Sequence, residues 1–249
     1  MRASGQSSTP QATPGLESAV RIQAPPPNYH FPTGQTWVYE VEWRLWRAGT
    51  ATLRLDEVNG EQHIHGTADS AGVVSLLYHV HDLFDTYFDP RTFCSSRIQK
   101  HVEEGFRRVE NTTTFDGARR VAVMQQTNLR KGDRSRAEHP IPPCVTDVLS
   151  AIYYVGSLPL VPGGTWEFPL NDGGETINGT AHAEEREQIK TPAGTFRTIR
   201  VQPQANRGVL KDRGKVWIWY TDDASHIPVQ MRARLFWGTL TFRLARVER

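Results

Sequence analysis

Five consecutive residues near the end of the chain, Val216-Trp217-Ile218-Trp219-Tyr220, constrain the fold more than any other segment. Side chains of a β-strand point alternately to opposite faces, so the two tryptophans lie on one face and the other three residues on the opposite face. Both faces are therefore apolar. Such a strand must be covered on both sides, by packing or by a ligand. The following run, Val229 to Trp237, alternates apolar and polar residues as a half-solvated strand does.

The same alternation recurs along most of the chain and predicts a β meander. Thr36 to Trp46 is expected to form a long strand, with a turn at Ala48-Gly49 and a hairpin signal at Asn59-Gly60. Ser70 to His79 is ambiguous and is compatible with a short helix. The other expected strands are 62–68, 80–88, 93–103, 106–115, 119–128, 165–170, 175–188, 196–204, 215–220, 229–237 and 239–247.

One segment has helical instead of strand spacing. Apolar residues recur with a helical period over about 146–155, Thr146 or Asp147 is placed to cap the start, and Gly156 to end the helix. The predicted fold is therefore all-β: a strongly curved antiparallel meander or incomplete barrel with one principal helix. A doubly apolar strand such as Val216 to Tyr220 is hard to place on an open sheet that faces water.

The chain divides into a leader and one folded domain. Residues 1–29 are rich in Pro, Ser and Thr, which predicts a disordered leader, and 30–249 form the expected β domain. No stretch approaches the ~18 apolar residues of a transmembrane helix. Met1 is not followed by the apolar core of an export signal.

Charge and motifs exclude several functions. The formal net charge of +2 is too balanced to demand a nucleic acid, so none is expected. Phosphate-binding loops, dinucleotide fingerprints and nucleophile motifs are missing, which favours a noncatalytic protein with no cofactor. The Glu40, Glu42, Glu103 and Glu184 carboxylates fit solvated strand faces better than a glycosidase pair.

The histidines are the alternative to a noncatalytic role. His63 and His65, like His79 and His81, are two residues apart, so each pair shares one face of a strand. Two imidazoles so placed can chelate zinc, copper or iron. Since a third ligand must come from elsewhere in the fold, paired exposed histidines are the competing interpretation.

The chain has two cysteines, Cys94 and Cys144. One disulfide in an oxidising compartment and two buried free thiols are both compatible with the sequence, and the spacing does not choose between them.

Several local patterns, in order, resemble the bacterial domain-of-unknown-function family 3108 over about residues 31–247. They are Gly34 to Glu42 with Ala48 to Ala51, Asp147 to Tyr154 with Leu158 to Leu160 and Pro162-Gly163, Thr191 to Phe196, and Val216 to Tyr220 leading to Val229. The resemblance implies a curved antiparallel β domain that is exported to the periplasm or cell envelope. It implies no established activity, so no site is carried over. The missing export signal leaves a cytoplasmic location as the alternative.

A curved envelope sheet suggests binding or scaffolding of an apolar or amphipathic small ligand. Trp37, Trp43, Trp217 and Trp219 are the candidate lining residues, because aromatic side chains supply large contact area in pockets. Core packing is the competing interpretation for each of them. A metal-dependent enzyme that uses His63, His65, His79 and His81 is the rival function. The sequence does not indicate the oligomeric state.

Overall fold

The computed structural model describes residues 20–44, 46–205, 214–235 and 238–249. The strands are β1 (Thr36–Trp43), β2 (Trp46–Val58), β3 (Glu61–Ser70), β4 (Val80–Phe88), β5 (Ser95–Glu104), β6 (Arg107–Asp116), β7 (Val121–Asn128), β8 (Arg134–Pro140), β9 (Thr146–Asp147), β10 (Thr165–Asn171), β11 (Thr176–Thr191), β12 (Gly194–Ala205), β13 (Lys215–Thr221), β14 (Pro228–Leu235) and β15 (Gly238–Glu248). The helices are α1 (Gly72–Leu77) and α2 (Val148–Ser157).

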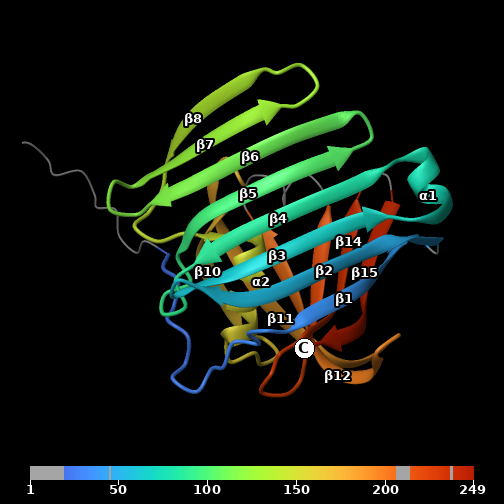
Figure 1. Cartoon of the computed structure of the whole chain (residues 1–249). Helices are drawn as coiled ribbons and strands as arrows, with labels where there is room; N and C mark the ends of the chain where they lie inside the picture. Colours follow the sequence, from blue (N-terminus) through green and yellow to red (C-terminus); the bar gives the residue numbers. More distant parts are fainter. Residues whose placement is uncertain (1–19, 45, 206–213, 236–237) are drawn as a thin grey trace, which may run out of the picture.

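The strands form one open sheet in the order β8-β7-β6-β5-β4-β3-β2-β1-β15-β14-β13-β12-β11-β10-β9. All pairings are antiparallel except the short parallel pair of β9 and β10. The sheet bends around α2, so that its two halves lie on either side of the helix (Figure 1). The prediction of a curved meander or incomplete barrel with one principal helix is confirmed.

The two halves meet at the start of α2. The Ser95 amide of β5 donates to the Val145 carbonyl at 2.8 Å, just before β9. Asp147 caps the helix, and its Oδ1 accepts the amides of Leu149 and Ser150. The Asp147 cap is one of the two alternatives that the sequence left open.

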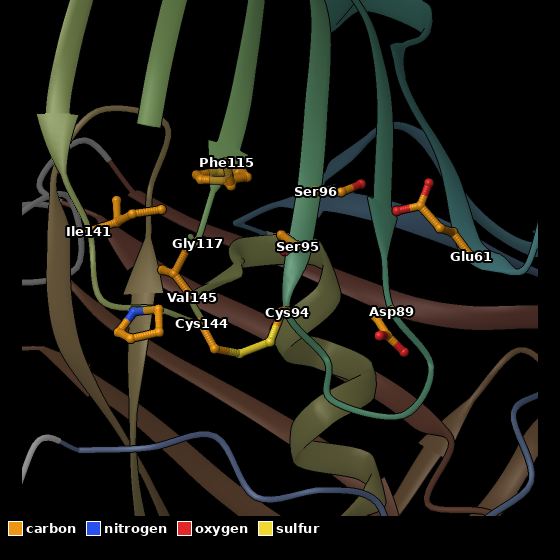
Figure 2. A pocket seen from close by; sticks show the side chains of 11 residues that line it. Glu61, Asp89, Cys94, Ser95, Ser96, Phe115, Gly117, Ile141, Cys144 and Val145 are labelled. Carbon is orange, nitrogen blue, oxygen red and sulfur yellow. A yellow bond between two sulfur atoms is a disulfide. The ribbon is translucent and has the colours of Figure 1, made fainter. Parts of the chain in front are cut away.

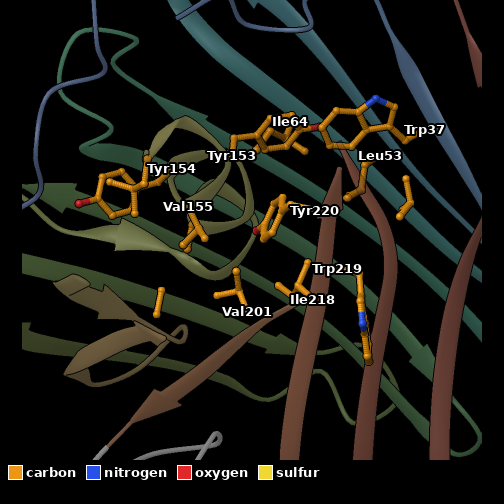
Figure 3. Close-up of a cluster of buried hydrophobic side chains, with 14 of the residues drawn as sticks. Trp37, Leu53, Ile64, Tyr153, Tyr154, Val155, Val201, Ile218, Trp219 and Tyr220 are labelled. Carbon is orange, nitrogen blue, oxygen red and sulfur yellow. The ribbon is translucent and has the colours of Figure 1, made fainter. Parts of the chain in front are cut away.

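Aromatic side chains fill the concave side of the sheet (Figure 3). Trp37 of β1 stacks on Tyr153 of α2, with ring centroids 4.9 Å apart. The hydroxyl of Tyr220 in β13 donates to the Ile152 carbonyl of α2 at 2.9 Å. The hydroxyl of the buried Tyr39 donates to the Pro228 carbonyl. The helix therefore serves as the centre of the hydrophobic core, with strands from both halves packed on it.

A long hairpin covers part of the opposite, convex side. β11 and β12 shift register near Ala183 and Arg186, a bulge that bends the hairpin. Its tip then reaches β15, where the Ala193 amide donates to the Leu244 carbonyl at 3.0 Å. The Arg243 guanidinium also donates to the Lys190 carbonyl. This hairpin explains why β13 is apolar on both faces: α2 covers one face and the hairpin the other.

Residues that precede β1 pack across the helix. Ile22 contacts the core, the Gln23 amide donates to the Tyr154 hydroxyl at 3.3 Å, and Tyr29 lies edge-on to Phe31. Ile22, Gln23 and Tyr29 belong to the segment 1–29, which the composition predicts to be a leader. The boundary at residue 30 stays a prediction, and residues 1–19 lie outside the described residues.

Two local predictions are wrong. Ala48 and Gly49 lie inside β2 instead of in a turn, because β1 ends at Trp43 and Arg44 takes the left-handed conformation. The register shifts where Val41 faces Gly49, which indicates a bulge there. Gly156 does not end α2: it lies within the helix, where a side chain would come within 3.3 Å of a neighbouring loop carbonyl.

Strand β8 was not predicted from the sequence. Arg134–Pro140 carries mainly charged and polar side chains and lies at an edge of the sheet. Charged edge strands oppose pairing with other chains, which accounts for the missing apolar alternation. The expected end of the strand after Val229, at Trp237, lies outside the described residues.

Candidate functional site

Trp217 and Trp219 line a hollow of about 300 Å³ on the convex side of β13. Cross-strand partners share a face, and Trp219 pairs with Arg200 of β12 and with Gln230 of β14. Since Tyr220 points to α2, these residues face away from the helix. The complete lining is Glu184, Arg200, Gln202, Lys215, Trp217, Trp219 and Arg232.

Two contacts fix the position of Trp219 in this hollow. Its indole Nε1 donates to Glu187 Oε1 of the covering hairpin at 2.7 Å. The Arg232 guanidinium lies 5.3 Å from the centre of the indole ring. The side chain is 3% exposed, whereas Trp217 is partly exposed at the mouth of the hollow. Trp219 is thus held in one position at the side of the hollow, and Trp217 is the tryptophan that a ligand can contact.

The charges around the hollow are unevenly compensated. Arg200 pairs with three carboxylates of β11, with Nη2 2.8 Å from Glu185 and Nη1 3.2 Å from Glu187, and with Nε against Glu184. Within the described residues, Lys215 and Arg232 make no ion pair of that kind. The hollow therefore offers an aromatic wall beside two cations that remain able to bind a negative group.

The other two candidate tryptophans lie elsewhere. Trp37 is buried between β1 and α2, where it stacks on Tyr153. Trp43 lies at the end of β1, against Gly238 and beneath the Arg44 guanidinium at 5.4 Å. The four tryptophans therefore do not line one cavity: the structure brings only Trp217 and Trp219 together.

The histidine candidates also separate into different places. His63 Nε2 and His65 Nδ1 on β3 both contact Asp85 Oδ1 of β4, at 2.7 and 2.8 Å. His81 instead contacts Asp69 at 2.6 Å, and His79 lies in the segment between α1 and β4. Asp85 is thus the third potential metal ligand beside His63 and His65. The four histidines predicted to act together do not form one group, because His79 and His81 lie elsewhere.

The environment of Asp85 keeps its carboxylate ionised. Burial raises its pKa, but hydrogen bonds from His65 and His63 outweigh burial, so the pKa lies below its usual value. His63 stacks on Tyr87 with ring centroids 4.4 Å apart, which fixes the imidazole plane. All three potential ligand atoms lie within 4.8 Å of one another. Two imidazoles and one carboxylate, open to solvent on one side, form a donor set suited to zinc or iron.

The two cysteines are joined at the contact between the sheet halves. Cys94 and Cys144 are disulfide-bonded, with Cα atoms 5.0 Å apart and 50 positions apart in the sequence. The disulfide borders a hollow of about 220 Å³ together with Phe115 and Ile141 (Figure 2). This volume is below the roughly 300 Å³ at which small-molecule sites usually begin. We therefore regard it as a packing gap beside the disulfide.

Sequence reasoning missed the polar side of the tryptophan hollow. Glu184 and Arg200 come from β11 and β12, and no local motif links them to Trp217 on β13. Their position beside Trp217 is visible only once the strand pairing is known, since cross-strand neighbours are far apart in the sequence. Asp85 was recognisable as a carboxylate close in sequence to the His79 and His81 pair, yet its partners are His63 and His65.

The fold defines an all-β protein with one open, curved sheet, and it is similar to the fold of a protein described as β-barrel-like. It resembles the crystal structure of a β-barrel-like protein of domain of unknown function DUF1849 from Brucella abortus, with a TM-score of 0.59. The two share 9% sequence identity, and the match covers 92% of this chain and 99% of the other. At this identity the likeness shows the fold alone.

The sequence defines the particular family. The family described as "Protein of unknown function (DUF3108)" matches residues 38–245, and the chain belongs to it. The expected family is thereby confirmed. No curated protein matches the chain.

Two further crystal structures are similar at lower scores. One is described as an exported protein with a YmcC-like fold from Bacteroides fragilis: TM-score 0.34, 14% identity, covering 89% of this chain and 98% of that one. The other is described as a lipoprotein from Parabacteroides distasonis: TM-score 0.33, 11% identity, covering 93% and 100%. Among the described residues, neither helix has the length and apolar character needed to cross a bilayer.

Proposed function

We propose that this DUF3108 protein is a noncatalytic binding protein of the cell envelope whose ligand is a small amphipathic anion. The observation that carries the proposal is the hollow of about 300 Å³ beside Trp217 and Trp219. An aromatic wall contacts the apolar part of such a ligand, while Lys215 and Arg232 attract its charged group. Small-molecule sites commonly combine apolar surface with a few convergent polar groups in this way.

An envelope location is supported by two features. The disulfide between Cys94 and Cys144 suits an oxidising compartment, because cytosolic thiols are kept reduced. The Pro/Ser/Thr-rich composition of the first residues is also typical of a linker ahead of an exported domain. Cell fractionation with an antibody against the native protein tests the location, and recovery from the cytosol would contradict it.

The ligand class is tested by titrating the protein with single-chain amphiphiles below their micelle concentrations. Dodecyl phosphate is the anionic probe, and the neutral dodecyl maltoside and cationic dodecylammonium are the comparisons. We expect dodecyl phosphate alone to bind, measured by calorimetry and tryptophan fluorescence, and Trp217→Ala and Lys215→Ala to weaken binding by about tenfold, as expected when a pocket anchor is removed. Val58→Ala is the control, because Val58 is an apolar residue at the end of β2 that is 38% exposed and does not line the hollow. Equal binding of all three probes, or full binding by Trp217→Ala, would refute the proposal.

A second candidate function, metal binding on β3 and β4, rests on the convergence of His63, His65 and Asp85. Three protein ligands with an open side are the arrangement of catalytic zinc sites, which makes a metal-dependent enzyme the alternative function. We expect zinc or ferrous ion to bind with a stoichiometry of one, measured by calorimetry on chelator-treated protein. His63→Ala and Asp85→Asn should abolish binding, whereas His81→Ala, which removes a histidine with a single carboxylate partner, should not. Retained binding in Asp85→Asn would exclude this site.

A further inference from the structure

Most of the strongly exposed apolar side chains in the described part of the chain gather along one edge of the sheet, the one formed by the ends of successive strands. Six of them, each more than half exposed, are here called the apolar rim: Trp46, Val73, Leu76, Leu77, Tyr78 and Phe106. They come from the start of β2 next to the β1–β2 turn, from α1 and the residue after it, and from the β5–β6 turn. In an antiparallel meander these connections all lie at the same ends of the strands, and Figure 1 shows α1 and these turns along the right-hand edge.

The segments of the rim contact one another and form one continuous surface. The Ala71 amide donates to the Ala48 carbonyl at 2.8 Å, which ties the start of α1 to β2. The Gly105 amide donates to the His79 carbonyl at 2.7 Å, which ties its end to the β5–β6 turn. The Tyr78 ring lies directly over Gly105, where an added Cβ would be 2.8 Å from the ring. The apolar side chains are therefore held at the edge by backbone contacts.

Helix α1 exposes the side chains that a helix on a protein surface would ordinarily bury. None of its residues is buried, and Leu76 and Leu77 are 86% and 78% exposed. Phe106 at the neighbouring turn is 87% exposed. Exposed apolar groups of this size are usually sites of contact with another protein or with a membrane. These groups occupy the tips of successive turns, so the rim presents projecting side chains and not a flat or hollow face.

Positive charge borders the same edge. The turns of this edge and the strand residues directly next to them carry Arg44, Arg107, Arg130, Lys131 and Arg134, against Glu104 and Asp133. Arg107 pairs with Glu104 at 3.2 Å. Arg130 lies 5.6 Å from the Phe106 ring centre and donates to the Phe106 carbonyl, which brings the β7–β8 turn to the rim.

We propose that the apolar rim docks on the surface of an anionic phospholipid membrane. Leucine, phenylalanine and tryptophan side chains at projecting tips can enter the boundary between headgroups and acyl chains, where tryptophan is favoured. The bordering arginines and lysine then lie at the level of the phosphates. The excess of positive charge makes an anionic leaflet the partner that fits, whereas a second copy of this chain would bring like charges together. The proposal is independent of the ligand hollow, which lies on the convex face of β13.

The test is sedimentation of the full chain with large vesicles of phosphatidylcholine, with or without about a third of phosphatidylglycerol. We expect binding only to the anionic vesicles, with affinity falling as salt is raised, because surface attraction to lipids is screened. The double variant Leu76→Ser, Leu77→Ser and the single variant Phe106→Ser should each bind about tenfold more weakly, since insertion depends on apolar contact. The double variant Arg130→Glu, Lys131→Glu should bind more weakly than the unchanged protein at low salt, and the difference should disappear at high salt, where the charges are screened.

Val58→Ser and Val161→Ser are matched controls, because they remove exposed apolar side chains outside the rim, 38% and 53% exposed. Both should bind as the unchanged protein does. Circular dichroism and the Tm establish that each variant is folded, which is expected for exposed positions. Three results would overturn the proposal. The first is no binding to anionic vesicles, and the second is undiminished binding by the Leu76 and Leu77 variant. The third is that the unchanged protein self-associates without vesicles and that this variant does not. The last result would assign the rim to contacts between copies.

Discussion

Replacing Asp147 tests whether one buried carboxylate holds the two halves of the sheet on the helix. Asp147 is 2% exposed, and its Oδ1 accepts the backbone amides of Leu149 and Ser150 at 2.9 and 3.1 Å. Its Oδ2 accepts the hydroxyls of Thr86 and Ser95, each at 2.6 Å, and that of Ser150. One side chain thus connects α2 with strands β4 and β5.

The expected cost of Asp147→Ala follows from these five hydrogen bonds. Loss of an N-cap side chain costs about 1–2 kcal/mol. Each buried hydroxyl left without an acceptor costs about 1–3 kcal/mol, less where it can rotate to another partner. We expect a total of about 4–6 kcal/mol, which for a chain of this size lowers the Tm by about 10–20 °C. Asp147→Asn keeps the Oδ1 acceptor but not Oδ2, so it should cost about half as much.

Denaturant unfolding followed by circular dichroism and by tryptophan fluorescence measures both free energies of unfolding. Asp56→Ala is the control, since Asp56 makes an exposed ion pair with Arg54, and it should change stability by less than about 1 kcal/mol. A loss below about 1 kcal/mol in the free energy of unfolding of Asp147→Ala would refute the reasoning, because five donors in a buried site would lose their acceptor. An equal cost for the Asn and Ala variants would show that Oδ1 contributes nothing.

Three other predictions concern a disulfide, a buried carboxyl and a turn. The Cys94–Cys144 bond closes a loop of about 50 residues, so Cys94→Ser with Cys144→Ser should lower the free energy of unfolding by about 4 kcal/mol, and thiol titration of the denatured, unreduced protein should find no free thiol. Burial and the nearby Glu104 raise the pKa of Asp82 to about 6, above its ordinary 3.8, so its contribution to stability is full below pH 4 and is lost as the pH rises through 6. Asp82→Asn should therefore raise the Tm by more at pH 8 than at pH 4, and an equal change at both would contradict the shift. Asp222 and Asp223 lie in the turn between β13 and β14, and replacing both by Asn should change the free energy of unfolding by no more than about 1 kcal/mol. The reason is that an Asn oxygen can still accept the hydrogen bonds that Asp223 accepts from Thr221 and Ser225. Unfolding of this double variant, or loss of its ligand binding, would point to a role that depends on charge.

The architecture could be predicted from the sequence because its determinants are local. Alternation of apolar residues identifies a strand without knowledge of its partners, and Asn59-Gly60 or Asp147 act within a few residues of themselves. The two-sided apolar pattern of Val216 to Tyr220 indicated correctly that both faces are covered. The predictions at Ala48-Gly49 and Gly156 failed because the role of these glycines is not local. Both glycines lie where a distant part of the chain comes close to their backbone.

The candidate sites depend on strand register, which the alternation pattern leaves open. His63 and His65 were recognisable as a pair, but their shared contact with Asp85 exists only because β4 aligns with β3 at that register. Trp37 and Trp219 look alike in sequence. Yet one packs on α2 and the other lies beneath the bent β11–β12 hairpin.

The sequence by itself determined a curved β sheet with one capped helix, because periodicity, turns and caps are encoded within short segments. Only the tertiary structure decided which side chains meet. The hollow beside Trp217, the histidines at Asp85 and the apolar rim each combine residues from separate strands or turns. Contacts of that kind are set by long-range strand pairing and by the bend of the sheet, and these emerge from the packing of the whole chain around α2.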